Sequence, residues 1–256
     1  MAFIEISGLR KVFDGGFEAL GGIDLRVRKG EFISVIGPSG AGKSTFLRCI
    51  NSTIEPSGGS VRVGDVQVEG LHGGKLFEHR ARIGFIFQQF NLVRNLTVLQ
   101  NVLVGRIAHS PMWRVLLGRW TDEDYRIAER FITDVGLRDK VHNRADALSG
   151  GQQQRVAIAR AMAQQPDLIL ADEPMASLDP KLSNVIRGLL KKFNDEEGIT
   201  VIVNLHVLEL ARRYSTRIVA LKAGRLAFDG GVDELDRAAL ERIYDIDKDL
   251  NLQELE

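Results

Sequence analysis

One octapeptide constrains this chain more than any other part of its sequence. It matches the pattern G-x-x-x-x-G-K-[ST] and consists of Gly37, Pro38, Ser39, Gly40, Ala41, Gly42, Lys43 and Ser44. A compact apolar run at 32–36 precedes it, and an amphipathic stretch that begins at Thr45 follows it. The glycines let successive backbone N–H groups point into one concavity, which the positive end of the following helix also faces. This order of strand, loop and helix predicts a nucleotide-phosphate site in an α/β fold.

The last two residues of the octapeptide carry its chemistry. We expect the Lys43 ammonium to neutralise charge on the β- and γ-phosphates and the Ser44 hydroxyl to ligate Mg²⁺. Another apolar run, at 168–171, ends at Asp172 and Glu173. At the carboxyl end of a parallel strand, Asp172 can reach the coordination sphere of Mg²⁺ through water. Glu173 is aimed differently, because adjacent strand residues point to opposite faces, and it can polarise the attacking water.

The charge balance and the cysteine count exclude several other classes of protein. The 256 residues hold 34 Lys plus Arg and 34 Asp plus Glu, and a net charge of zero disfavours a protein that covers nucleic acid or an anionic membrane through its overall field. The single cysteine, Cys49, excludes an internal disulfide and is typical of a reducing compartment. The longest stretches without Asp, Glu, Lys or Arg span 11 residues, fewer than the ~20 apolar residues of a membrane-spanning helix. We therefore expect a soluble, intracellular chain.

Hydrophobic patterns predict the strands. The first third of the chain alternates in polarity, which favours an antiparallel sheet, whereas solid apolar runs later on suit parallel strands buried on both faces. The expected strands lie near 3–7, 23–27, 32–36, 60–68, 83–87, 168–172, 199–205, 217–221 and 225–228.

Capping residues predict where the longer helices begin. Thr121 with Asp124 and Ser149 with Gln152 form capping boxes, and a third helix begins at 179–180 with proline in its first position. A shorter helix is expected near 207–214, and the acid-rich residues 245–256 are expected to form a loosely held tail. The strand–helix–strand order towards the C-terminus implies a mostly parallel sheet with right-handed crossovers.

A further motif connects the chain to a known family. Residues 148–155 read Leu-Ser-Gly-Gly-Gln-Gln-Gln-Arg and resemble the signature motif of ATP-binding-cassette ATPases. Other residues of the family's motifs stand in the same order, namely the octapeptide, Gln88, Asp172, Glu173, Ser177, Leu178, Asp179 and His206. The resemblance covers roughly residues 4–230. It implies an ATPase that uses ATP and Mg²⁺ and folds as a single α/β domain over 1–256. That domain would combine a P-loop NTPase core, an N-terminal antiparallel β subdomain and a helical signature-motif subdomain at about 95–165.

The signature motif predicts a second phosphate-binding helix start. Free N–H groups at the beginning of a helix, with the Ser149 hydroxyl, form an anion site. The resemblance implies that Ser149, Gly150, Gly151 and Gln152 close on the ATP of a partner subunit. Two ATP molecules would then be sandwiched in a head-to-tail homodimer.

The same resemblance assigns the remaining site residues. Glu173 and His206 would act in catalysis, with His206 contacting the γ-phosphate. Gln88 would reach the metal and the water while relaying to a membrane partner, and the nucleotide contacts would extend to Thr45 and Asp179. Phe13 resembles the aromatic residue that stacks on adenine, and Phe17 lies close enough in sequence to compete with it. The histidines that match no motif are His72, His79, His109 and His142.

Within the family, the resemblance favours an importer subunit. The chain carries one cassette, and the 59 residues between Gln88 and Leu148 are too few for the long coiled coil of DNA-repair relatives. The permease would be a separate membrane protein whose coupling helix docks near the apolar segment 90–99. The chain would lie peripherally at the cytoplasmic face of the inner membrane. A periplasmic or extracellular solute-binding protein would be an indirect partner, and no nucleic acid is expected.

Among importers, the sequence is most similar to the phosphonate-import ATP-binding proteins. An added stretch at 105–120, which holds Trp113 and Trp120, carries part of this similarity. Because the transported solute never touches this chain, phosphate, phosphite or a polar amino acid are alternatives. A soluble nucleotide-switch protein that acts on nucleic acid is an alternative of another class, and the balanced charge disfavours it.

Overall fold

The fold is built around a six-stranded sheet with the strand order β10-β9-β3-β8-β7-β6. The computed structural model describes residues 2–175, 179–205 and 208–245. The strands of this sheet are β3 (Phe32–Ile36), β6 (Ile83–Ile86), β7 (Leu168–Ala171), β8 (Thr200–Asn204), β9 (Arg217–Lys222) and β10 (Arg225–Gly231). All neighbours from β9 to β6 are parallel, and β10 pairs antiparallel with β9. The expectation of a mostly parallel sheet is confirmed.

A second, antiparallel sheet holds the N-terminal part of the chain. Its order is β2-β1-β4-β5, with β1 (Ile4–Val12), β2 (Glu18–Val27), β4 (Gly58–Val63) and β5 (Val66–Gln67). The single strand expected at 60–68 is wrong, because Val63 pairs with Val66 across a turn at Gly64, whose φ is 60°. The expected antiparallel piece is confirmed.

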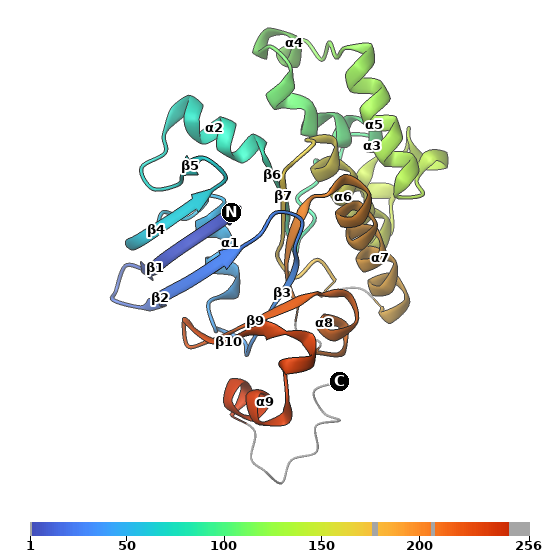
Figure 1. The fold of residues 1–256 in the computed structure, drawn as a ribbon. Helices are drawn as coiled ribbons and strands as arrows, with labels where there is room; N and C mark the ends of the chain where they lie inside the picture. The colour runs from blue at the N-terminus through green and yellow to red at the C-terminus, as the bar shows by residue number, and fades with distance from the viewer. Residues whose placement is uncertain (1, 176–178, 206–207, 246–256) are drawn as a thin grey trace.

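The two faces of the central sheet bury two separate hydrophobic layers. Ile33 and Leu170 pack towards the antiparallel sheet and helix α1 (Lys43–Ile50), whereas their neighbours Phe32 and Ile169 pack towards the other helices. All four side chains are almost fully buried. This alternation explains why the central strands read as continuous apolar runs, since both faces of the sheet are covered. Figure 1 shows the central strands between these two layers.

The helices lie on both faces of the central sheet: α1 packs on the face towards the antiparallel sheet, and most of the others pack on the opposite face (Figure 1). They are α1 (Lys43–Ile50), α2 (Gly73–Ala81), α3 (Val98–Leu103), α4 (Met112–Leu116), α5 (Asp122–Asp134), α6 (Gly150–Ala163), α7 (Pro180–Glu197), α8 (Leu208–Tyr214) and α9 (Arg237–Tyr244). Shorter 3₁₀ turns are η1 (Val104–His109), η2 (Arg138–Lys140), η3 (Ala145–Ala147) and η4 (Val232–Glu234). Both expected capping boxes are present, at the starts of α5 and α6. In the described part of the chain, no helix combines the length and the apolarity needed to cross a bilayer.

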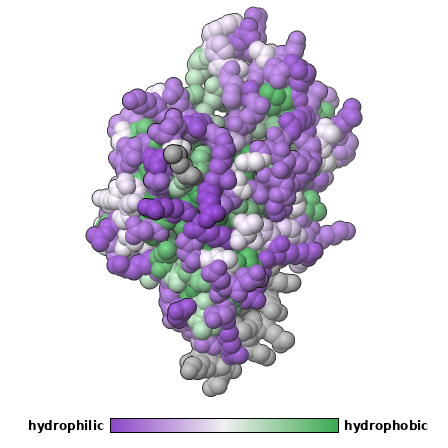
Figure 2. Space-filling view, viewed as in Figure 1, coloured by the Kyte–Doolittle hydropathy of each residue, from purple (hydrophilic) through white to green (hydrophobic). Residues whose placement is uncertain are grey.

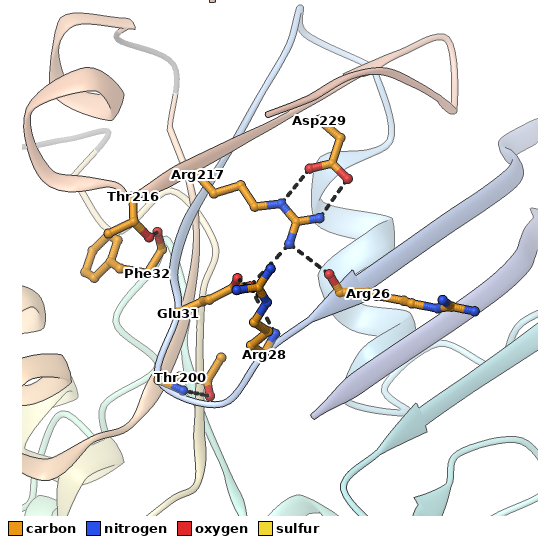
Figure 3. A network of polar contacts seen from close by, with 9 residues as sticks. Arg26, Arg28, Glu31, Phe32, Thr200, Thr216, Arg217 and Asp229 are labelled. Atoms are coloured by element: carbon orange, nitrogen blue, oxygen red, sulfur yellow. Dashed lines mark hydrogen bonds and ion pairs between the residues drawn. The ribbon is translucent and has the colours of Figure 1, made fainter. Parts of the chain in front are cut away.

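An arginine network joins the two sheets where the start of β9 meets the end of β2 (Figure 3). The Arg217 guanidinium donates to both carboxylate oxygens of Asp229, at 2.6 and 2.7 Å, and to the Arg26 carbonyl oxygen at 2.8 Å. It also donates to Glu31 at 3.2 Å. The Asp229 carboxylate is the main cause of the raised pKa of Arg217. Because Arg217 lies on β9 and Arg26 on β2, this network fixes the antiparallel sheet against the central one.

Cys49 and His79, for which the sequence predicts no catalytic role, are both buried and act in packing. Cys49 is fully buried, and burial raises the pKa of its thiol to about 12, so it behaves as a small apolar residue. The His79 imidazole donates to the Ile50 carbonyl oxygen at 2.9 Å, and burial lowers its pKa. His79 thereby fastens α2 to the end of α1.

Candidate nucleotide site

The octapeptide forms the loop between β3 and α1, as its pattern predicts. Gly37, Gly40 and Gly42 have φ values of 140°, 78° and 96°, in the region that favours glycine. A Cβ atom on Gly37 would lie 2.1 Å from the Leu221 carbonyl oxygen, and one on Gly42 would lie 2.5 Å from that of Ala19. Two of the glycines are therefore required by close approach of β9 and β2 as well as by backbone conformation.

Lys43 lies curled against this loop. Its ammonium donates to the Gly37 carbonyl oxygen at 2.7 Å and to that of Pro38 at 3.1 Å, and only 5% of the residue is exposed. Burial lowers the pKa of Lys43, while the nearby carboxylates of Glu173 and Asp172 act in the opposite direction. The loop thus holds a cation within reach of any anion that its N–H groups bind.

A pocket of about 210 Å³ opens over the loop. The residues that line it are Phe17, Ala19, Ser39, Gly40, Ala41, Gly42, Lys43, Ser44, Thr45 and Glu173. Most of the residues expected to contact a nucleotide phosphate therefore share one cavity, which has an aromatic side chain at one side.

Asp172 is the buried centre of the polar contacts below this pocket. Its Oδ1 accepts hydrogen bonds from the Ser44 hydroxyl at 2.7 Å and from the Asn204 amide at 2.8 Å. Its Oδ2 accepts from the Arg48 guanidinium at 3.3 Å, and the residue is 3% exposed. The structure thus brings together Ser44 and Asp172, the two residues that the sequence places near Mg²⁺. Arg48 and Asn204 were not among the residues expected from the sequence.

Glu173 follows Asp172 but has a different environment. Its φ of 50° is left-handed, which is uncommon for a residue with a side chain and often marks a functional site. This turn of the backbone brings Glu173 to the pocket wall, next to Lys43. The expectation that the two adjacent carboxylates are aimed differently agrees with this arrangement.

The two candidate aromatic residues for adenine lie in the turn between β1 and β2. Phe17 is 63% exposed and lines the pocket. Phe13 is 37% exposed, and the Lys11 ammonium lies 5.2 Å from its ring centroid. The geometry brings Phe17 to the phosphate loop and leaves Phe13 outside the pocket lining.

Ser149 begins helix α6 and is exposed. Its hydroxyl accepts from the Gln152 backbone N–H at 3.4 Å, and Gln152 Oε1 accepts from the Ser149 N–H at 3.0 Å. Gly151 faces α7: a Cβ atom there would lie 2.7 Å from Leu182 Cδ1. None of these residues lines the pocket over the phosphate loop. The helix starts that belong to the two motifs, α1 at the phosphate loop and α6 at Ser149, are therefore separate within one chain.

Asp179 caps the neighbouring helix α7. Its carboxylate accepts from the Leu182 backbone N–H at 3.0 Å. Because Leu182 also packs against Gly151, the starts of α6 and α7 are held together. Ser177, Leu178 and His206 lie outside the described residues, as does the expected tail from residue 246 onwards.

Gln88 lies in an exposed turn two residues after β6. The next part of this turn, Phe90 and Asn91, has left-handed φ values of 51° and 50°. Arg160 of α6 donates to the Phe90 carbonyl oxygen at 2.9 Å and to that of Asn91 at 2.6 Å. Burial lowers the pKa of Arg160. This arginine, which the sequence did not single out, fastens the Gln88 turn to the helix that begins at Ser149.

Comparisons with known proteins agree with this arrangement. The protein-family profile described as "ABC transporter" matches residues 20–176. The "Phosphonates import ATP-binding protein PhnC" of Thiobacillus denitrificans is 49% identical over 244 residues, which cover 95% of this chain and 93% of that protein. "Phosphonates import ATP-binding protein PhnC 2" of Halalkalibacterium halodurans is 46% identical, with 94% of this chain and 99% of that protein covered.

Solved structures give the same result. The dimeric structure of MJ0796, a bacterial ABC transporter cassette, has a TM-score of 0.80 and 37% sequence identity, covering 90% of this chain and 98% of that one. A post-hydrolysis dimer of the same cassette bound to ADP and Pi has a TM-score of 0.78 and 36% identity, with the same coverage. The fold class expected from the sequence is confirmed.

The contact of Arg160 with the Gln88 turn leads to a testable expectation. Arg160→Ala removes the donors that hold two left-handed residues, a loss of about 1.5–3 kcal/mol for hydrogen bonds of this charged kind. Amide exchange in residues 88–92, followed by mass spectrometry, should therefore become roughly 10- to 150-fold faster. Arg126→Ala, which removes an exposed arginine on α5, is the matched control and should leave exchange there unchanged. Equal exchange in both variants would show that Arg160 does not hold the turn.

Proposed function

This chain belongs to the ABC transporter family of ATP-binding proteins, and we propose that it is the ATP-hydrolysing subunit of a phosphonate importer. The observation that carries the proposal is similarity to phosphonate-import ATP-binding proteins over nearly the whole chain, at 44–49% identity. The pocket over the phosphate loop supports the ATPase part of it, since Lys43, Ser44 and Glu173 share that cavity.

ATP would bind with its phosphates in the loop between β3 and α1. The N–H groups of residues 39–45 and the start of α1 would hold the phosphate oxygens, and Lys43 would move from its carbonyl partners to the β- and γ-phosphates. Phe17, at the wall of this cavity, is better placed than Phe13 to stack on the adenine. Stacking needs an aromatic face beside the phosphate site, and Phe17 provides one.

The residues present suit Mg²⁺. The Ser44 hydroxyl and the Asp172 carboxylate are hard oxygen ligands that lie 2.7 Å apart beside the phosphate loop. Ser44 would hold the ion directly, with Asp172 and Gln88 reaching it from the ends of β7 and β6. When bound, the ion would neutralise charge on the phosphate oxygens. Arg48 and Asn204 would keep the Asp172 carboxylate oriented towards it.

Hydrolysis needs a group that accepts a proton from water. Glu173 is the residue of choice, because it reaches the pocket wall near Lys43. The water oxygen would attack the γ-phosphorus, the bond to the leaving β-phosphate oxygen would break, and the water proton would pass to the Glu173 carboxylate. Lys43 would stabilise the charge on the transferring group. Gln88 would orient the water, and His206 would contact the γ-phosphate.

A second copy of the chain would complete each site. The helix start formed by Ser149, Gly150, Gly151 and Gln152 lines no part of the pocket in its own chain, and its first two residues, Ser149 and Gly150, are exposed. In a head-to-tail homodimer the N–H groups of this start and the Ser149 hydroxyl would bind the γ-phosphate held by the partner. The dimeric form of the related cassette MJ0796 supports this assembly. The cap at Asp179 would lie at the same interface.

A groove beside the Gln88 turn suits the helix of a membrane permease. It has a volume of about 440 Å³ and lies between α2, β6, η1 and α6. Its apolar lining includes Phe77, which is 47% exposed, and the ring pair Phe85–Phe87, whose centroids lie 4.5 Å apart. An apolar groove of this kind binds one face of an amphipathic helix. Arg160 and Asn91 also line it, so an occupant would touch the turn that carries Gln88. The proposed docking site lies beside, and partly before, the segment 90–99 expected from the sequence.

The importer would work at the cytoplasmic face of the inner membrane. The permease would anchor the chain there, and a solute-binding protein outside the cell would deliver the phosphonate to the permease. Selection of the solute would reside in those two partners.

Exchange of Glu173 for glutamine should separate ATP binding from hydrolysis. The amide keeps the shape of the carboxylate but cannot accept a proton, so hydrolysis should fall by ~10²–10⁴. With ATP and Mg²⁺, light scattering should show a persistent dimer for Glu173→Gln and mostly monomer for the wild type. Lys43→Ala is the matched control, which should fail to form the dimer because ATP binding is weakened. Hydrolysis at the wild-type rate in Glu173→Gln would assign the base elsewhere.

The solute is tested by growth. A strain that lacks this chain should fail to grow on a phosphonate as the sole phosphorus source, while growth on inorganic phosphate should be normal. The wild-type chain should restore growth and Glu173→Gln should not. If the deletion strain grew normally on phosphonate but poorly on phosphite or on an amino acid, the chain would be the subunit of an importer for that other solute.

A further inference from the structure

Helix α4 presents its apolar face to solvent. Met112, Trp113, Leu116 and Leu117 are 59%, 55%, 79% and 63% exposed. Met112 lies four residues before Leu116, and Trp113 lies four residues before Leu117, which caps the end of the helix. Each pair therefore lines up along the helix, and the two rows are neighbours on its surface. We call these four residues the apolar knob. Figure 2 shows a surface that is mostly hydrophilic on the face viewed, and in Figure 1 α4 projects at the outer end of the helical part. Clustered exposed apolar side chains of this kind mark a contact site.

The apolar knob is held firmly and is not a frayed loop. Just before it, the buried Arg106 guanidinium donates to Asp124 at 3.0 Å and to the Ala163 carbonyl oxygen at 2.8 Å. Just after it, Trp120 packs against the hydrophobic core. Hydrogen bonds from Gly118 and Arg119 to the Val115 and Arg114 carbonyl oxygens, at 3.0 and 2.8 Å, close the end of the helix. The fold therefore fixes the knob in its exposed position.

Two arginines, Arg114 and Arg119, belong to the knob's own stretch at 107–121, which holds no acidic residue although the total charge of the chain is zero. Acidic residues follow at 122–124 in the first turn of α5, where Asp124 pairs with Arg106. The Arg114 guanidinium lies 5.3 Å from the Trp113 ring centroid. Tryptophan, leucine and arginine on one short helix are the composition of segments that lie in the interface of an anionic bilayer.

The position of the knob agrees with a membrane contact. Val104, Gly105, Ile107 and Ala108 of the preceding turn η1 line the groove in which we placed a permease helix. Met112 is four residues beyond Ala108, so the knob starts at most about 14 Å from that groove. This step rests on the proposed function: a permease helix in the groove brings the knob close to the membrane surface.

We propose that α4 binds the surface of an anionic phospholipid bilayer beside the permease. The four apolar side chains enter the boundary between headgroups and acyl chains, and Arg114 and Arg119 contact lipid phosphates. The added stretch at 105–120 is thereby a lipid-contacting element that holds the cassette against the membrane during its cycle.

The chain carries its own probe for this contact. Trp113 and Trp120 are its only tryptophans, so Trp120→Phe leaves the knob as the sole source of tryptophan emission. This variant should show a blue-shifted emission with vesicles that contain phosphatidylglycerol. Binding should be roughly tenfold or more weaker on vesicles of phosphatidylcholine alone, because two arginines lose their anionic partners.

Two further variants make the result specific. Leu116→Ser with Leu117→Ser, in the Trp120→Phe background, should lose the emission shift while ATP hydrolysis and the ATP-dependent dimer are kept. Val185→Ser removes an exposed apolar side chain from α7 and should bind vesicles normally. Equal vesicle binding by the double-serine variant would overturn the proposal. The proposal would also be overturned if the Trp113 emission did not shift with vesicles but shifted with purified permease in detergent. That result would assign the apolar knob to a protein contact. If neither the wild type nor any variant hydrolysed ATP, the result would instead count against the proposed function.

Discussion

The site depends on one buried carboxylate. Asp172 lies at the end of β7, accepts hydrogen bonds from Ser44 of α1 and Asn204 of β8, and forms an ion pair with Arg48. A buried carboxylate is costly unless several donors satisfy it, so these contacts define where α1 sits relative to the central strands. Since α1 follows the phosphate loop directly, the same contacts fix the loop. The nucleotide pocket is thus a consequence of how one acidic residue is accommodated.

Local patterns in the sequence sufficed for much of the fold. Residues 32–36 and 168–171 read as strands because both faces of the central sheet are covered, and the capping boxes at Thr121 and Ser149 mark where α5 and α6 begin. Helix α2 had no such signal, since it starts with two glycines and buries mainly His79. The turn that divides 60–68 into two strands depends on Gly64 alone. Because apolar and polar residues alternate on both sides of it, the sequence reads as one continuous strand.

The candidate site divides in the same way. The octapeptide, Asp172 and Glu173 are local motifs and could be named from the sequence. Arg48 and Asn204 act on Asp172 from 124 and 32 residues away, and Arg160 acts on the Gln88 turn from about 70. An arginine on an amphipathic helix reads as a surface residue unless the partner is known. Asn204 offered a usable signal, because a lone amide ends an otherwise apolar parallel strand beside the phosphate loop.

Helix α6 contacts both the start of α7 and the turn that carries Gln88. Gly151 packs on Leu182 of α7, and Arg160 holds the turn that carries Gln88 and borders the groove. Movement of an occupant in that groove can therefore reach the start of α6. The exposed Ser149 would pass this movement to a second copy of the chain.

Division of each ATP site between two copies is tested most directly by diluting the isolated chain. With saturating ATP and Mg²⁺, the rate of hydrolysis per chain should rise in proportion to protein concentration while monomers predominate, and should level off when dimers do. A rate per chain that is constant across the range in which light scattering detects the change from monomer to dimer would contradict a shared site.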